Sequence, residues 1–178
     1  TEWSESLIED GFKQDNHMFY ILTNSRALNE QETTQLHQEI SRNIARVSQR
    51  LDHPYIVISR GDSTLRGHFY LEPKVLSEAS DEQFDGVFYI PAFFEGKRYT
   101  FDGIHYLKEG DAYIPVSESE FANDTTFGFS SRTMASFIEE KSNGEINTND
   151  VKRIRLSQIR ERDAQSINEV LNSISNFD

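Results

Sequence analysis

Residues 59–68 gather the side chains and the glycines that a site for a small anion needs. They read Ser-Arg-Gly-Asp-Ser-Thr-Leu-Arg-Gly-His and follow the hydrophobic run of residues 54–58. A strand that ends in a loop rich in glycine and hydroxyl side chains is typical of ligand sites in α/β proteins. The segment therefore predicts a loop that binds a small anionic ligand.

Each polar residue of this loop has a chemical use. Arg66 can hold a carboxylate or a phosphate through two parallel hydrogen bonds, and backbone amides near Gly67 can add donors. Asp62 can accept a proton or a hydrogen bond from a substrate hydroxyl, so it is the candidate catalytic residue, and Ser63 can complete a polyol site. The neighbouring Arg60 adds positive charge. Together these groups favour an acid that carries several hydroxyls.

A structural interpretation of the same residues stays open. Asp62 and Ser63 would then cap the helix that follows, and Arg66 would pair with a surface carboxylate. The loop is not expected to bind a nucleotide, because a P-loop ends in Gly-Lys-Ser/Thr whereas here Gly67 is followed by His68.

A second group of candidates follows the hydrophobic run of residues 86–91. In a parallel sheet, Arg98 would reach the same edge as Arg66. Asp102 and His105 stand three residues apart, and they can orient a hydroxyl or relay a proton if the chain bends between them. The chain has no cysteine, and its five histidines lack zinc-ligand spacing, so no metal site is expected.

Composition argues against nucleic acid and membranes as partners. The net charge of -12 and the pI near 4.8 repel phosphate backbones and anionic lipid surfaces. In the basic run of residues 152–155, charged and hydrophobic residues alternate as they do in an exposed edge strand. Positive charge on such a strand discourages pairing with the edge of another sheet. No hydrophobic run reaches the roughly 18 residues that a membrane span needs. We therefore expect a single cytoplasmic domain over residues 1–178.

Hydrophobic periodicity predicts the elements that position these candidates. Near-continuous hydrophobic runs at residues 19–23, 55–59 and 86–91 predict parallel strands, and the segments between them predict helices. Residues 98–116 alternate and predict a β-hairpin excursion, and residues 151–156 predict a further strand. We expect an α/β fold of three layers, with a mostly parallel sheet covered by helices on both faces, plus the hairpin.

Helix signals are clearest around residues 30–51. Asn29 and Glu32 form a capping box for this helix, and hydrophobic residues recur along it every three or four positions. A helix capped by Ser130 or Ser131 is expected to reach about residue 141. Asp163 is expected to cap a last helix.

The segment Asp62-Ser63-Thr64-Leu65-Arg66-Gly67-His68-Phe69 resembles the Asp-Ser-Thr-x-Arg-Gly signature of the four-carbon acid sugar kinase family. Four further similar segments occur in the same order: residues 22–26, residues 91–93 with 96–99, residues 102–103 and residues 115–124. The resemblance implies the sugar-acid-binding N-terminal domain of a kinase that phosphorylates threonate, erythronate or 3-oxo-tetronate with ATP. It also implies that Arg98 lies at the substrate.

The same resemblance implies what completes the enzyme. The family's first strand ends in an Asp-Asp-x-Thr-Gly type motif, which this sequence lacks, and many members carry lysine near the position of Arg60. ATP binds to a separate C-terminal domain in the family. ATP and Mg²⁺ are therefore expected in the full-length protein, and no cofactor is expected in this chain alone. The missing C-terminal nucleotide-binding domain is expected as a partner. The isolated chain is not expected to turn over.

Two alternatives stay open. The first is a non-catalytic module of α/β fold that binds or senses a small carboxylate with the same loop. The second concerns assembly, because the sequence does not distinguish a monomer from a homodimer.

Overall fold

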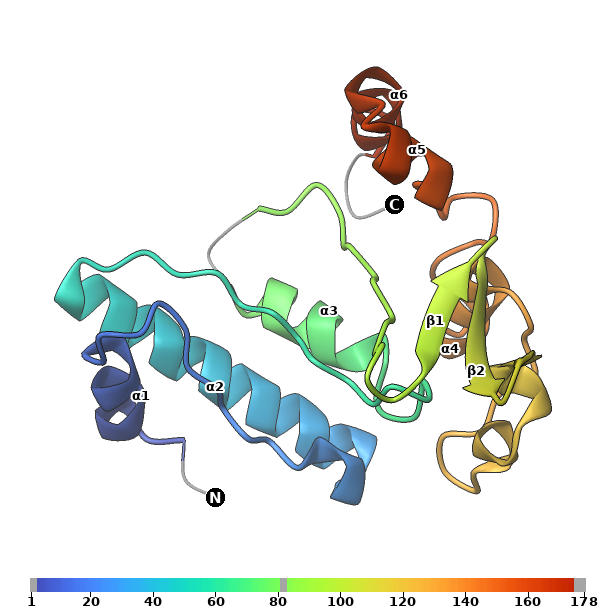
Figure 1. Cartoon of the computed structure of the whole chain (residues 1–178). Helices are drawn as coiled ribbons and strands as arrows, with labels where there is room; N and C mark the ends of the chain where they lie inside the picture. The colour runs from blue at the N-terminus through green and yellow to red at the C-terminus, as the bar shows by residue number, and fades with distance from the viewer. Residues whose placement is uncertain (1–2, 81–82, 175–178) are drawn as a thin grey trace. The chain divides into compact units, whose positions relative to one another are not determined.

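A computed structural model describes residues 3–80 and 83–174 (Figure 1). The chain divides into two compact units, each with its own hydrophobic core. The first unit contains residues 3–60 with 71–80 and 83, and the second contains residues 61–70 with 84–174. The single domain that the sequence predicts over residues 1–178 stays a prediction.

Helices form the first unit. They are α1 (Glu5–Phe12), α2 (Glu30–Leu51) and α3 (Leu71–Glu78), with a 3-10 turn, η1, at Ser25–Ala27. The predicted capping box is confirmed, because Glu32 N donates to Asn29 Oδ1 and Asn29 N donates to Glu32 Oε2, both at 2.9 Å. One face of α2 forms the core of this unit together with Ile8 of α1: Leu36, Ile40, Ile44 and Val47.

The second unit contains an antiparallel sheet of three strands in the order β1-β2-β3. The strands are β1 (Arg98–Phe101), β2 (Ile104–Glu109) and β3 (Ala112–Pro115). The predicted hairpin is therefore present, and its register pairs Thr100 with His105. Asp102 (φ 51°) and Gly103 (φ 75°) make the turn between β1 and β2 in left-handed backbone conformations, which glycine adopts without strain.

Short helices complete this unit. After β3 come two 3-10 turns, η2 (Val116–Glu118) and η3 (Glu120–Asn123), and then α4 (Met134–Lys141). Thr133 caps α4, since its Oγ1 accepts from Ser136 N at 3.2 Å; the predicted cap at Ser130 or Ser131 is wrong. We call residues 62–69 the signature loop. The core of this unit joins the signature loop to β2, η2, η3 and α4 through buried residues: Leu65, Leu107, Val116, Ala122, Phe129, Phe137 and Ile138.

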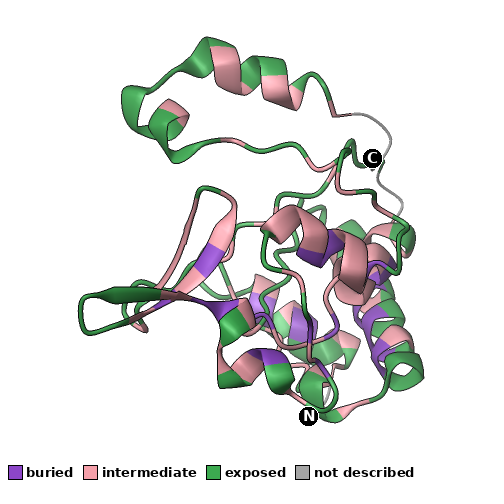
Figure 2. Ribbon diagram, turned by 90° about the vertical axis from the view of Figure 1, so that its right-hand side faces the viewer, coloured by how far each residue is buried: buried purple, intermediate pink, exposed green. Residues whose placement is uncertain are grey.

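The last two helices of the second unit are α5 (Leu156–Glu161) and α6 (Ala164–Leu171). Asp163 caps α6 as predicted, because it accepts from Ser166 N at 3.1 Å. Neither helix has a fully buried residue (Figure 2). In the part of the chain that the structure describes, no helix is long and hydrophobic enough to cross a membrane.

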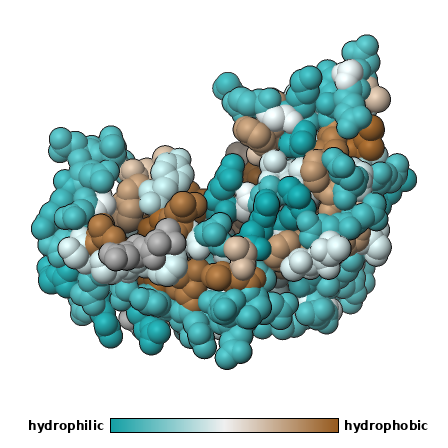
Figure 3. Space-filling view, turned by 90° about the horizontal axis from the view of Figure 1, so that it is seen from below, coloured by the Kyte–Doolittle hydropathy of each residue, from teal (hydrophilic) through white to brown (hydrophobic). Residues whose placement is uncertain are grey.

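The predicted three-layer fold with a mostly parallel sheet is wrong. The described residues form six α-helices and the one antiparallel sheet, whereas residues 19–23, 55–59, 86–91 and 151–155 form no strand. Several hydrophobic side chains of these segments face solvent instead, such as Ile56, which is 90% exposed. Hydrophobic patches are visible on one face of a mainly hydrophilic surface (Figure 3).

The physical reason is that a hydrophobic run predicts burial without specifying a pairing partner. Phe19, Ile21 and Tyr55 pack against the α2 core. A strand also requires a neighbouring backbone to accept and donate its hydrogen bonds, and no described segment supplies one here. The strand predicted over residues 151–156 is also absent, and its last residue, Leu156, begins α5.

Candidate anion site

The signature loop has a defined turn that fixes its side chains. Leu65 N donates to Asp62 O at 3.1 Å, and Leu65 has a left-handed backbone with φ 66°. This conformation is unfavourable for a residue with a Cβ, by roughly 1–2 kcal/mol. Leu65 is only 5% exposed and belongs to the core of the second unit, so its burial offsets that cost. Gly67 follows at φ 138°, where glycine is favoured.

Asp62 organises the loop through its carboxylate. Its Oδ2 accepts hydrogen bonds from Thr64 N at 3.2 Å, from Thr64 Oγ1, and from Arg66 Nε at 3.2 Å. Burial opposes ionisation, but the hydrogen bonds from Thr64 and Arg66 outweigh it and hold the pKa of the Asp62 carboxyl below its ordinary value. A carboxylate with a lowered pKa is a weaker base, so these contacts support a role in positioning. Catalysis by Asp62 stays a prediction.

The guanidinium groups of two arginines lie near the same aromatic ring in this unit. The guanidinium carbon of Arg66 lies 4.9 Å from the centre of the Phe121 ring, and that of Arg98 lies 5.9 Å from the same point. Arg66 comes from the signature loop, Arg98 begins β1, and Phe121 lies in η3. The fold thus brings together two cations that are 32 positions apart in sequence, which can attract an anion.

The two arginines differ in their partners. Arg66 donates to Asp62 and forms an ion pair with Asp124, with 3.8 Å between Nη1 and Oδ2. Arg98 donates from Nη1 to the carbonyl of Gly96, while its Nε is buried without a hydrogen-bond partner. Within residues 3–80 and 83–174, Arg98 has no ion pair with a carboxylate. Its charge is therefore the less neutralised of the two.

A loop after η3 holds the carboxylate that pairs with Arg66. Asp124 Oδ1 accepts from Thr126 N and Phe127 N, both at 2.9 Å. From α4, Lys141 Nζ donates to the carbonyls of Phe127 at 3.2 Å and Gly128 at 2.7 Å. Burial lowers the pKa of the Lys141 ammonium, although Glu140 and Asp124 oppose this effect. Lys141 thus connects α4 to the loop that positions Asp124.

His105 ties β2 to the signature loop and is 2% exposed. Its Nε2 lies 2.8 Å from the carbonyl oxygen of Ser63, which can only accept, so Nε2 carries the proton. Its Nδ1 lies 2.7 Å from Thr100 Oγ1. Burial lowers the pKa of His105, the Ser63 carbonyl raises it, and the charge of Arg98 lowers it further. His105 is consequently favoured as a neutral ring that holds Ser63 in place.

Five of the residues that the sequence singled out therefore lie in this unit with contacts that link them: Asp62, Ser63, Arg66, Arg98 and His105. Asp102 does not pair with His105, because both ring nitrogens of His105 already have partners. Asp102 is exposed at the hairpin turn, where its carbonyl accepts from Arg153. Arg60 is exposed and belongs to the first unit, and Gly67 contributes through its backbone conformation.

Sequence reasoning missed Phe121 and Asp124 as site residues. Both lie in residues 115–124, a segment that the family resemblance included. Their types gave no chemical signal, since a phenylalanine is usually a core residue and an aspartate is usually a turn or surface residue. Their position beside two arginines depends on the tertiary structure.

The residues of this site do not fit Mg²⁺, the metal ion that ATP would bring. A magnesium site uses carboxylates that are available to the cation. Here Asp62 and Asp124 both face Arg66. The described part of the chain also contains no group of three or more His, Cys, Asp or Glu residues that could hold a metal.

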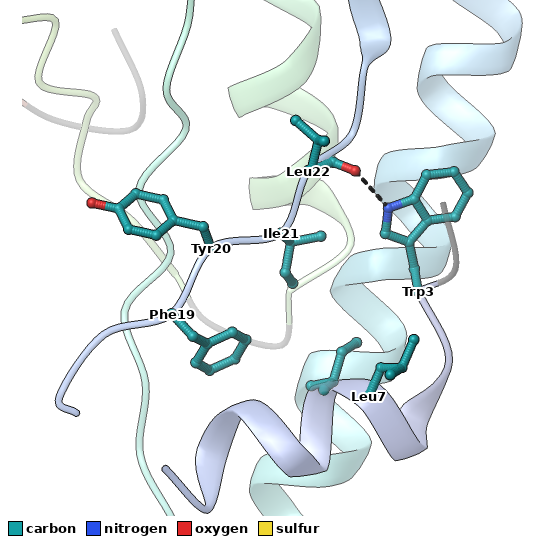
Figure 4. Close-up of a pocket in the computed structure, with 7 residues that line it drawn as sticks. Trp3, Leu7, Phe19, Tyr20, Ile21 and Leu22 are labelled. Carbon is teal, nitrogen blue, oxygen red and sulfur yellow. Dashed lines mark hydrogen bonds between the residues drawn. The ribbon is translucent and has the colours of Figure 1, made fainter. Parts of the chain in front are cut away.

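A pocket in the first unit has a different character (Figure 4). Its lining is hydrophobic and aromatic: Trp3, Leu7, Ile8, Phe19, Tyr20, Ile21 and Leu22. The Trp3 Nε1 donates to the carbonyl of Leu22 at 3.1 Å and closes one side (Figure 4). Because none of the described residues that line it is charged, this pocket offers no counter-charge for a sugar acid.

Comparison with known proteins gives one match. A family model described as "Sugar-binding N-terminal domain" matches residues 4–176. No curated protein and no solved structure matches the chain. The family model covers nearly the whole chain and includes every residue of the candidate site.

Proposed function

Because the chain belongs to this family, the sugar-binding N-terminal domain of the four-carbon acid sugar kinases, we propose that it binds the sugar acid that its kinase phosphorylates. The proposed substrates are four-carbon acids of the threonate, erythronate or 3-oxo-tetronate type. Such a ligand presents one carboxylate and several oxygens that form hydrogen bonds. It therefore requires a cation with unused donors beside polar groups.

The observation that carries the proposal is the state of Arg98. Its Nε is buried without an acceptor, and no carboxylate in the described residues pairs with it. A buried donor without a partner is costly, by roughly 1–3 kcal/mol, and a bound carboxylate would supply the missing acceptor. Arg98 is thus the proposed carboxylate anchor.

Arg66 has a different proposed role. Asp62 and Asp124 neutralise it, and its Nε is used by Asp62 and Thr64. The remaining guanidinium hydrogens are proposed to bind hydroxyl oxygens of the sugar acid. Asp62 and Ser63 form the wall of the site beside them, with Asp62 held as a carboxylate.

We place ATP and Mg²⁺ in another part of the whole kinase, because the carboxylates of this site face Arg66 and are not available to Mg²⁺. ATP supplies the phosphoryl group in the family's reaction. This chain contributes by binding and orienting the acid and by neutralising its charge, which are the main requirements of phosphoryl transfer. By itself, the chain is proposed to bind without turnover.

Isothermal titration calorimetry with matched ligands tests this function. Threonate and erythronate are compared with threitol and erythritol, which have the same four-carbon chain but carry a hydroxyl in place of the carboxylate. We expect the acids to bind and the polyols to bind at least about tenfold more weakly, since a charge-assisted hydrogen bond contributes about 1.5–3 kcal/mol. Equal affinity for acids and polyols, or no binding of either acid, would contradict the proposal.

Turnover separates a kinase domain from a non-catalytic sensor. The complete kinase is incubated with ATP, Mg²⁺ and each acid, and ³¹P NMR follows the formation of a phosphate ester. Ester formation supports the kinase. Tight binding of the acids without ester formation would favour the sensor.

A further inference from the structure

The ring of Phe121 lies close to both arginines of the site. Arg66 and Arg98 lie 4.9 and 5.9 Å from its centre. Two guanidinium groups held near one ring repel each other, and a ring face attracts both through its quadrupole. The ring can therefore hold together two cations that would otherwise separate.

The backbone around Phe121 is fixed by its own hydrogen bonds. Phe121 N donates to Ser119 Oγ at 3.3 Å, and Ser119 Oγ donates to Val116 O at 2.6 Å. Asp124 N donates to Phe121 O at 3.4 Å, which closes η3. The turn that presents the ring is thus linked directly to the residue that pairs with Arg66.

The ring is also supported by the core of the second unit. Phe121 is partly buried and packs against the hydrophobic cluster that contains Leu65, Leu107 and Val116. A ring that is held by packing loses little freedom when a cation contacts it. This support makes Phe121 a rigid surface for the two guanidiniums.

Arg98 depends on this contact more than Arg66 does. Arg66 is also oriented by Asp62 and Asp124, whereas the side chain of Arg98 is oriented by the Gly96 carbonyl and by the ring. Removal of the ring face should therefore release Arg98 first.

We propose that Phe121 is a positioning residue that orients Arg98 and Arg66 so that both can bind one sugar acid. The inference rests on the proposed function, because it assigns a residue to the same site. Phe121 acts through the arginines, and its aromatic face rather than its volume is the property that matters.

Two substitutions separate the aromatic face from simple packing. Phe121→Leu keeps a hydrophobic side chain but removes the ring, and Phe121→Tyr keeps the ring. Phe129→Leu is the matched control, since Phe129 lies in the same core cluster and packs edge-on against Phe137. We expect Phe121→Leu to bind erythronate about tenfold more weakly than the wild type. Phe121→Tyr and Phe129→Leu should stay within about twofold.

A readout without ligand keeps this inference separate from the proposed function. The Nε–Hε protons of Arg66 and Arg98 should show ring-current shifts in ¹H–¹⁵N NMR spectra of the wild type. These shifts should vanish in Phe121→Leu and persist in Phe121→Tyr. If the shifts behave so but no acid binds, the proposed function fails while the arrangement of the ring stands.

The inference is overturned by any of three results. The first is that Phe121→Leu leaves both ring-current shifts unchanged. The second is that the wild type binds erythronate and Phe121→Leu binds it equally well. The third is a loss of affinity in Phe129→Leu as large as that in Phe121→Leu, because packing alone would then explain the effect.

Discussion

Substitution of Gly128 by alanine tests the loop that positions Asp124. A Cβ at this position would lie 2.5 Å from Asp124 O and 2.8 Å from Ala122 O. Both are backbone atoms that cannot rotate away, and both accept hydrogen bonds from this loop, from Gly128 N and Phe129 N. The chain must therefore shift to admit the methyl group, and Asp124 must shift with it.

The expected cost is that of inserting a methyl group where there is no space, about 1–3 kcal/mol. For a chain of this length, each kcal/mol lowers the melting temperature by about 2–4 °C. Gly128→Ala should therefore lower the melting temperature by about 2–12 °C. Movement of Asp124 away from Arg66 should also weaken the binding of erythronate.

Thermal unfolding followed by circular dichroism measures this effect, with Gly61→Ala as the matched control. A Cβ at Gly61 meets no atom within 4 Å, so that variant should melt as the wild type does. The packing argument is refuted if Gly128→Ala and Gly61→Ala melt at the same temperature.

Three further predictions concern groups around the site. Burial lowers the pKa of His105 below 6.5, so the free energy of unfolding should decrease as the pH falls through 6.5, where the unfolded chain takes up the proton first. His105→Gln should reduce this decrease in the free energy of unfolding, measured by urea titrations between pH ~7.5 and ~5.5. The same decrease in His105→Gln and in the wild type would refute the assignment to His105. Asp62→Asn should lower the free energy of unfolding by about 1–3 kcal/mol, because the charge-assisted bond to Arg66 is lost, and an unchanged denaturation midpoint would contradict this. Lys141→Met removes the ammonium group that donates to the carbonyls of Phe127 and Gly128, so limited proteolysis should cut this loop faster than in the wild type. An equal cutting rate would show that the loop does not depend on Lys141.

Local signals in the sequence predicted local structure well. The capping box of Asn29 and Glu32 begins α2, and the alternating residues 98–116 form the hairpin and its third strand. Both patterns depend on neighbours close in sequence. The family was also predicted, from the signature of residues 62–69 and four further segments in the same order, and the family model confirms it.

Patterns that depend on distant partners were less informative. The hydrophobic runs at residues 19–23, 55–59 and 86–91 correctly indicate inward-facing side chains such as Phe19 and Tyr55, yet none of the runs is paired as a strand. Pairing depends on where other segments lie, which periodicity does not encode.

The candidate site shows the same limit. Arg66 and Asp62 were both predicted as site residues because they stand in one loop, but their ion pair appears only in the structure. His105 was predicted to pair with Asp102, but the hairpin register places it beside Thr100. The meeting of Arg66 with Phe121 joins residues 55 positions apart, and only the folded chain shows it.

The most direct test of the central claim is the affinity of Arg98→Gln for erythronate, measured by calorimetry beside the wild type. Arg132→Gln is the control, since Arg132 is an exposed arginine that pairs with Glu118 at 3.5 Å outside the proposed site. If Arg98 anchors the carboxylate, Arg98→Gln should bind at least about tenfold more weakly. Arg132→Gln should bind as the wild type does. Equal affinity of Arg98→Gln and the wild type would contradict the account.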